Sequence, residues 1–192
     1  MQTFLISTHR LQPLHRGHIH YWHLLVAQFK MPLIICILRN ATRAPRADGS
    51  LTEFDKHSDF ALQRSRNPLP NWERLQLVSL ALKSDPILND MVTPILRSPA
   101  DAGWEQSIVD LPQNRLWAFN LGDEVEFATS KFTHYRSMGE KAVEVNYPRT
   151  LGFDGSKIRE GVTKGRKDLE FLPDACHPYF AEQCLGYFGG TK

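Results

Sequence analysis

The sequence is short of features that define several large classes of protein. It has three cysteines among 192 residues, and the odd number without paired spacing does not indicate a disulfide framework or a zinc site. Its longest apolar runs have the length of a strand, far short of the roughly 20 residues that span a bilayer. No signal peptide is visible at the N-terminus, so we expect a protein of the reducing cytoplasm.

An excess of charge of one sign is also missing. Lys and Arg number 23 against 21 Asp and Glu, which gives a formal net charge of +2. A balance this even provides no general attraction to nucleic acid or to an acidic membrane surface, so we expect neither as a partner. Binding of anions must therefore depend on a few locally placed side chains. With 42% hydrophobic residues the chain can bury the core of one domain.

Apolar runs alternate with helical periodicity along the chain, which is the pattern of an α/β protein. Residues 3–7 and the aliphatic run 33–38 predict strands buried on both faces of a parallel sheet. Apolar residues between them recur at helical spacing: Ile19, Trp22, Val26 and Phe29. The first 38 residues therefore predict a β-α-β unit.

The alternation continues beyond this unit. We expect further helices at 73–83, 104–111 and 124–132, and further strands at 91–96, 115–121 and 141–146. Pro94 cannot donate a ladder hydrogen bond, so the strand 91–96 is expected at an edge of the sheet. The whole pattern predicts an α/β fold with a doubly wound, mostly parallel sheet and a C-terminal helical segment.

Two segments interrupt the alternation. Residues 39–66 are rich in polar and turn-forming residues with little apolar periodicity, and predict a long loop insertion of the kind that is often a functional lid or disordered. Residues 168–192 contain enough aromatic and aliphatic side chains for a packed helix. We therefore expect one domain over 1–167, with 168–192 as a helical appendage of the same domain.

Two histidines flank an Arg-Gly pair where the first strand gives way to the first helix, in the segment RLQPLHRGH (10–18). In open α/β sheets, ligands bind beyond the carboxyl ends of the strands, where a loop leads into a helix N-terminus. Gly17 allows close backbone approach, and the helix start offers N–H groups and a partial positive charge. Because each imidazole of His15 and His18 can also donate to a phosphate oxygen, the segment predicts a phosphate-binding turn.

Other interpretations apply to nearby residues. A zinc site is disfavoured, because no Asp, Glu or Cys lies at ligand spacing and Arg16 adds positive charge. His20 and His23 are interpreted as solvated or packing histidines. Three tryptophans are interpreted as core residues: Trp22, Trp72 and Trp117. Ser156 and Arg159 could present a hydroxyl and a guanidinium to one phosphate, or could be a helix cap and a solvated arginine.

The segment RLQPLHRGH resembles the G-R-F-Q-P-x-H-x-G-H opening of the nucleotidyltransferase superfamily with the HxGH signature. It is most similar to that of nicotinamide mononucleotide (NMN) adenylyltransferases of archaeal type. Four further segments resemble family motifs in the family order: SRNPLPNWER (65–74), AGW (102–104), NLGD (120–123) and DGSKIRE (154–160). The resemblance extends over residues 3 to 165.

The resemblance implies a Rossmann-like fold and transfer of AMP from ATP to NMN, forming NAD and releasing pyrophosphate. The acceptor phosphate is already a nucleophile, so positioning and charge neutralisation supply the rate, with Mg²⁺ carried by the ATP phosphates and few protein ligands. Catalytic roles are implied for Arg10, His15, His18 and Arg159. ATP-binding roles are implied for Gln12, Pro13, Gly17, Gly122, Ser156, Lys157 and Ile158. Acceptor-binding roles are implied for Arg66, Asn67 and Trp104. The implied partners are ATP and a mononucleotide, and we expect a homo-oligomer.

Three departures from the family pattern leave alternatives open. His9 stands where the family has Gly, Asp154 replaces the first Ser of the C-terminal signature, and the 39–66 loop is longer than the family's. His9 predicts less room near the triphosphate, and Asp154 must point away or serve a metal ion. Other acceptors therefore stay open: pantetheine phosphate, nicotinate mononucleotide or a cytidylyl acceptor. A non-catalytic nucleotide-sensing module, in which these replacements mark lost chemistry, is the alternative from another class.

Overall fold

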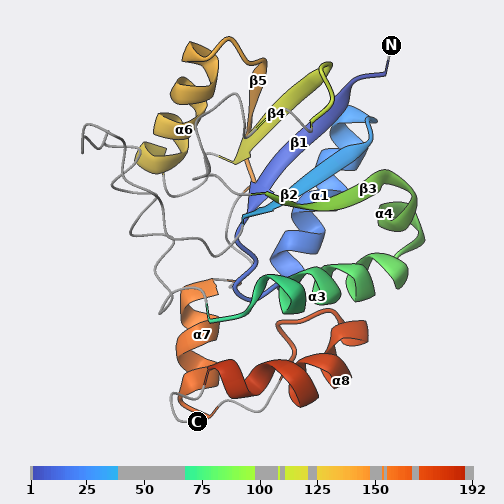
Figure 1. Ribbon diagram of the computed structural model, residues 1–192, viewed down its shortest axis with the longest axis vertical. Coiled ribbons are helices and arrows are strands. Elements are labelled where there is room, and N and C mark those ends of the chain that lie inside the picture. The colour runs from blue at the N-terminus through green and yellow to red at the C-terminus, as the bar shows by residue number, and fades with distance from the viewer. Residues whose placement is uncertain are drawn as a thin grey trace.

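The computed structural model describes residues 2–38, 68–97, 108, 111–120, 125–147, 153, 155–165 and 169–188. Within these residues, five parallel strands form one sheet in the order β3-β2-β1-β4-β5 (Figure 1). The strands are β1 (Phe4–His9), β2 (Leu33–Leu38), β3 (Val92–Arg97), β4 (Arg115–Asn120) and β5 (Ala142–Val145). This order confirms the predicted doubly wound α/β fold.

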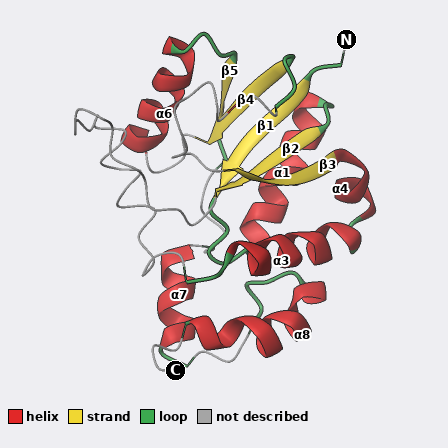
Figure 2. Ribbon diagram, in the orientation of Figure 1, coloured by secondary structure: helices red, strands yellow, loops and turns green. Residues whose placement is uncertain are grey.

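Helices alternate with strands along much of the described chain (Figure 2). They are α1 (Arg16–Phe29), α3 (Asn71–Lys83), α4 (Pro86–Met91), α6 (Val125–Ser137) and α7 (Gly155–Thr163). The C-terminal segment forms consecutive short helical turns: η2 (Asp174–Cys176), α8 (His177–Tyr179), η3 (Phe180–Cys184) and η4 (Leu185–Tyr187). Glu73 of α3 accepts a hydrogen bond from the Tyr179 hydroxyl at 2.5 Å, which holds this segment against α3.

The core lies on both faces of the sheet, because successive strand residues point to opposite sides. Every residue of β2 is buried. Ile35 and Ile37 pack in one core cluster with Trp22 of α1 and Leu77 of α3. Ile34 and Cys36 pack in the other, with Trp117 of β4 and Tyr135 of α6. This strand of aliphatic residues therefore packs against helices on both faces of the sheet, as its sequence predicted.

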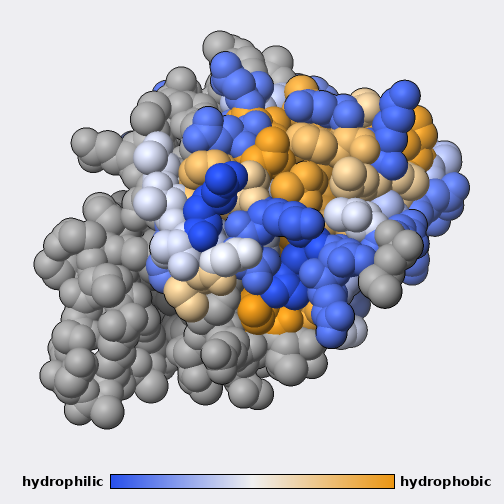
Figure 3. Space-filling view, turned by 90° about the horizontal axis from the view of Figure 1, so that it is seen from above, coloured by the Kyte–Doolittle hydropathy of each residue, from blue (hydrophilic) through white to orange (hydrophobic). Residues whose placement is uncertain are grey.

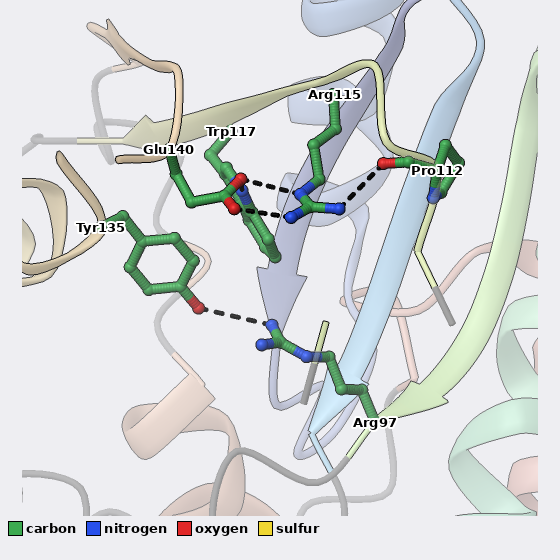
Figure 4. Close-up of polar contacts among 6 residues, drawn as sticks. All are labelled: Arg97, Pro112, Arg115, Trp117, Tyr135 and Glu140. Carbon is green, nitrogen blue, oxygen red and sulfur yellow. Dashed lines mark hydrogen bonds and ion pairs between the residues drawn. The ribbon is translucent and has the colours of Figure 1, made fainter. Parts of the chain in front are cut away.

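Polar contacts link β3, β4, α6 and Glu140, which lies just before β5 (Figure 4). The Arg115 guanidinium donates two hydrogen bonds to Glu140, at 2.7 and 2.5 Å, and the Trp117 indole N–H donates a third at 2.7 Å. Nearby, the Arg97 guanidinium donates to the Tyr135 hydroxyl at 3.3 Å and lies 5.1 Å from the centre of the Trp117 ring. Hydrogen bonds from Arg115 and Trp117 hold the pKa of Glu140 below its usual value, so the carboxylate stays ionised at neutral pH.

Some details of the elements agree with the sequence prediction and others differ from it. Pro94 lies on an edge strand, as predicted, since β3 pairs with β2 alone. Helix α4 was not predicted; Asp85 caps it by accepting from the Leu88 N–H, and Pro86 begins it. The expectation that Trp72 is a core residue is wrong, because Trp72 is 61% exposed. Trp22 and Trp117 are buried as expected.

The surface of the described part mixes polar and apolar side chains. Seen from above the view of Figure 1, apolar residues are interspersed with strongly hydrophilic ones (Figure 3). The large exposed apolar side chains belong to different segments: Trp72, Ile87, Met138 and Tyr187. None of the described helices combines the length and the apolar character that a bilayer crossing needs.

Candidate active site

The turn between β1 and α1 is held in one conformation by residues far away in the sequence. Leu11 adopts a left-handed backbone conformation with φ of 53°, which is uncommon outside glycine and typical of functional turns. The Gln12 amide exchanges two hydrogen bonds of 2.9 Å with the backbone of Leu69. The side chains of Gln12 and Pro13 are buried, so these two predicted ATP-binding residues could reach a ligand chiefly through their backbone.

Arg74 of α3 fixes the same turn from inside the molecule. Its fully buried guanidinium donates hydrogen bonds of 2.6 Å to the carbonyls of Arg10 and Leu38, at the carboxyl ends of β1 and β2. A third donation goes to the side chain of Asn71. Burial lowers the pKa of Arg74 to about 10, so the group stays charged at neutral pH. Sequence reasoning missed this role, although Arg74 closes the SRNPLPNWER segment.

The two predicted catalytic histidines lie together where α1 begins. The ring centres of His15 and His18 are 3.7 Å apart. The His15 backbone N–H donates to Nδ1 of His18 at 3.2 Å, which places the proton of a neutral His18 on Nε2. The His15 ring is buried and stacks on Phe153 with ring centres 6.0 Å apart. The arrangement therefore provides an imidazole N–H donor on His18 at a helix N-terminus.

His9, which stands where the similar HxGH segments have glycine, packs against α1. Its Nε2 accepts a hydrogen bond from the Trp22 indole at 3.3 Å and lies 3.0 Å from the Ser7 hydroxyl. Its ring meets those of His18 and Tyr21 edge to face. Burial, with smaller contributions from Lys131 and His15, lowers the pKa of His9 to about 3. His9 is therefore neutral at physiological pH and adds no charge beside His18.

A side chain at Gly17 would be crowded by its neighbours. A Cβ atom there would lie 3.0 Å from Phe153 Cβ and 3.0 Å from His15 Nδ1. Such contacts are closer than side chains tolerate without movement. The glycine therefore lets the first turn of α1 approach both the His15 ring and Phe153, the residue just before the segment that carries Ser156 and Arg159.

Helix α7 brings Ser156 and Arg159 to the histidine turn. The Arg159 guanidinium donates to the carbonyl of Gln12 at 2.7 Å and to the Ser156 hydroxyl at 2.9 Å. Ser156 and Lys157 are exposed, whereas the side chain of Ile158 is buried in the core. Of these predicted ATP-binding residues, Ile158 could thus contribute only through its backbone.

Other predicted residues either lie elsewhere or fall outside the described part. His20 is exposed and meets Phe153 edge to face, and His23 pairs with Asp85 at 2.6 Å, as expected for solvated or packing histidines. Five site residues or departures named from the sequence lie outside the described residues: Arg66, Asn67, Trp104, Gly122 and Asp154. The 39–66 loop lies outside them as well.

The donors gathered at this turn suit an anion. They are the imidazoles of His15 and His18, the Ser156 hydroxyl and the Arg159 guanidinium, near the N-terminus of a 14-residue helix. In the part of the chain that the structure describes, no three His, Cys, Asp or Glu side chains are grouped as a metal site. The arrangement can neutralise phosphate charge at the carboxyl edge of the sheet.

Comparison with solved structures shows which known proteins have a similar fold. No protein-family model matches the sequence, and no curated protein does. Two solved structures from Francisella tularensis are similar over 98% and 97% of this chain, with TM-scores of 0.58 and 0.59 and identities of 15% and 16%. Both are described as a bifunctional NMN adenylyltransferase/ADP ribose pyrophosphatase, one of them complexed with AMP and a manganese ion. The chain spans about half of their length, 52% in each case.

A third similar structure has nearly the same length as this chain. It is a candidate nicotinate-nucleotide adenylyltransferase from Vibrio parahaemolyticus, with a TM-score of 0.56 and 12% identity. The match covers 94% of this chain and 99% of that one. At such identities the likeness establishes a shared fold, the Rossmann-like α/β fold of these nucleotide-binding proteins.

Proposed function

We propose that this chain is a nucleotidyltransferase that transfers AMP from ATP to NMN, forming NAD and releasing pyrophosphate. The observation that carries the proposal is the pairing of His15 and His18 at the N-terminus of α1, with Arg159 of α7 anchored on the same turn. The fold shared with adenylyltransferases from Francisella and Vibrio supports it. So does the order of motifs along the sequence.

The chemistry requires no side-chain nucleophile. An oxygen of the acceptor phosphate attacks the α-phosphorus of ATP, the bond from that phosphorus to the bridging oxygen breaks, and pyrophosphate leaves with the electron pair. We propose that His18 donates its Nε2 hydrogen to oxygens that gain charge in this step, while His15 supports the His18 ring. Arg10 and Arg159 would hold the β and γ phosphates. Donors that are already fixed in place lower the activation barrier, because they do not have to reorient as charge develops in the transition state.

A divalent ion is proposed to enter with ATP. One Francisella structure contains AMP together with a manganese ion. The imidazole, hydroxyl and guanidinium donors of the described turn fit phosphate oxygens, so Mg²⁺ would be held mainly by the phosphates themselves. Such an ion would neutralise part of the phosphate charge.

Nicotinate mononucleotide is the second candidate acceptor. The Vibrio protein of similar length is a candidate nicotinate-nucleotide adenylyltransferase, which favours this reading. The two acceptors differ by a carboxylate in place of a neutral amide on the pyridine ring, so the residues around that ring decide between them. We propose that Arg66, Asn67 and Trp104 make this choice, with Trp104 stacking on the ring.

The test is an assay with purified protein, ATP, Mg²⁺ and each acceptor in turn. We expect pyrophosphate release that depends on a pyridine mononucleotide, with NAD identified as the product by mass spectrometry. Preference for nicotinate mononucleotide would give the deamidated dinucleotide instead and would replace the first candidate by the second. Nucleotide binding without release of pyrophosphate from ATP in the presence of either acceptor would contradict the proposal and favour a sensing module.

A further inference from the structure

Arg16, the variable residue of the HxGH segment, contacts the far end of the chain. It is the first residue of α1, between His15 and Gly17. Its backbone N–H donates to the carbonyl of Phe171 at 2.8 Å. Its side chain donates through Nε to the carbonyl of Glu170 and through Nη2 to Oδ1 of Asp174, both at 2.7 Å.

These contacts occupy donors that could otherwise bind phosphate. An arginine between two histidines that we propose to bind phosphate could itself be a ligand for a triphosphate. In the structure, its guanidinium instead bonds to a carbonyl and a carboxylate of residues 169–174, more than 150 positions along the chain. The same stretch accepts the first backbone N–H of α1, one of the donors that a helix cannot satisfy internally. We call residues 169–174 the C-terminal tether.

From these contacts we infer that Arg16 is a positioning residue: it binds the first turn of α1 to the C-terminal tether and thereby sets the place of His18. The inference rests on the proposed function of the histidine pair. His18 lies two residues after Arg16, and its Nδ1 is hydrogen-bonded to the backbone of His15, directly before Arg16. A shift or rotation of this turn would therefore redirect the Nε2–H of His18.

The solvent exposure of the Arg16–Asp174 pair indicates that it positions the turn of α1 more than it stabilises the fold. The Arg16 side chain is 37% exposed and that of Asp174 is 83% exposed. Exposed ion pairs contribute little to the free energy of unfolding. Catalysis is far more sensitive, because a small misplacement of a catalytic group lowers the rate strongly. Loss of the tether should therefore lower turnover much more than it lowers stability.

The rival explanation is that Arg16 leaves Asp174 and binds ATP directly. The two explanations predict opposite results for Asp174→Ala. If Arg16 positions the turn, this change weakens the tether and lowers kcat. If Arg16 is a phosphate ligand, the change releases Arg16 towards ATP, so kcat is kept and the KM for ATP falls or stays the same.

The experiment compares Arg16→Ala and Asp174→Ala with wild type in the full chain. Steady-state kinetics give kcat and the KM for ATP, and hydrogen exchange without substrate reports the backbone amides of residues 16–18. We expect kcat to fall about tenfold or more in Arg16→Ala and about threefold in Asp174→Ala, with the KM for ATP changed less than about threefold. Amide exchange at 16–18 should be faster in both variants.

A control variant removes an exposed contact that does not involve the tether. Lys164→Ala breaks the Lys164–Glu160 ion pair of 2.5 Å at the end of α7. It should keep the wild-type kcat and exchange rates. If Arg16→Ala does not fold, Asp174→Ala still tests the tether through the same two measurements.

Some results would overturn the inference. A large rise of the KM for ATP in Arg16→Ala, with unchanged kcat in Asp174→Ala, would make Arg16 a phosphate ligand. Unchanged exchange at 16–18 in both variants would show that the tether does not hold the turn. A wild-type protein without adenylyl transfer would contradict the proposed function, while the exchange measurement would still decide whether Arg16 holds the turn.

Discussion

Gly17 shows how one missing side chain shapes the site. Alanine would be favoured over glycine by roughly 1 kcal/mol in an open helix. Here its Cβ would lie 3.0 Å from both Phe153 and His15, so overpacking should outweigh that gain. We predict that Gly17→Ala lowers the free energy of unfolding by about 1–2 kcal/mol and also lowers turnover. Urea unfolding and the pyrophosphate assay measure the two effects.

Gly186 offers a matched control within the C-terminal helical turns. A Cβ atom at this position meets nothing within 4 Å. Gly186→Ala should therefore leave stability unchanged or slightly raised, and turnover unchanged. Equal stability of Gly17→Ala and wild type would show that the first turn of α1 can move away from Phe153.

His9 makes stability depend on pH. Its pKa is lowered from 6.5 to about 3 in the folded protein, so below 6.5 the unfolded chain binds a proton that the folded chain does not. Its contribution to stability is therefore complete above pH 6.5 and declines as the pH falls towards 3. We predict that between about pH 7 and about pH 5, wild type loses about 2 kcal/mol more than His9→Gln. Urea unfolding at the two pH values checks this, and equal losses would contradict it.

At the scale of the elements, the Arg115–Glu140 pair connects the start of β4 to the residues before β5. Both side chains are only 11% exposed, so removing one partner leaves the other poorly solvated. We predict that Glu140→Gln lowers the free energy of unfolding at neutral pH by about 2–4 kcal/mol. Because hydrogen bonds from Arg115 lower the pKa of Glu140, this contribution is present above its usual pKa and is lost as the pH falls through the folded value.

Thermal or urea unfolding of Glu140→Gln beside Glu160→Gln separates a buried pair from an exposed one. Glu160 pairs with Lys164 on the surface of α7, with side chains 62% and 73% exposed. Its replacement should not change the unfolding midpoint measurably. Similar behaviour of the two variants would mean that the Glu140 network adds nothing specific to the fold.

The elements that could be predicted from sequence are those with a strong local signal. The aliphatic run 33–38 predicted a doubly buried strand because both faces of β2 meet helices. Pro94 predicted the edge strand through its missing N–H. Helix α4 escaped prediction because six residues show little periodicity, although Asp85 followed by Pro86 was a usable start signal.

The placement of side chains could be predicted only where it depends on neighbours in sequence. The pairing of His15 and His18 follows from their spacing at a helix start. Arg74 is buried because its guanidinium meets carbonyls at the ends of two strands, a partnership that only the folded chain creates. Trp72, two residues earlier on α3, is exposed for the complementary reason: it lies on another side of the helix.

At the scale of the whole molecule, the candidate site is assembled from four distant parts of the chain. Residues 10–18 form the turn, 68–74 lock it from one side, 155–159 meet it from another, and the C-terminal tether holds the start of α1. We therefore expect adenylyl transfer to require the folded chain through residue 174. A homo-oligomer in the cytoplasm stays our prediction for its state in the cell.

The most direct test of the central claim is the turnover of His18→Ala with ATP, Mg²⁺ and NMN. The account predicts that kcat falls by about 10²–10³-fold, because a donor to the charge that develops in the transition state is lost. The melting temperature should stay close to that of wild type, and His20→Ala, on the exposed side of the same helix, should keep full activity. A stable and fully active His18→Ala would contradict the claim that this turn performs the reaction.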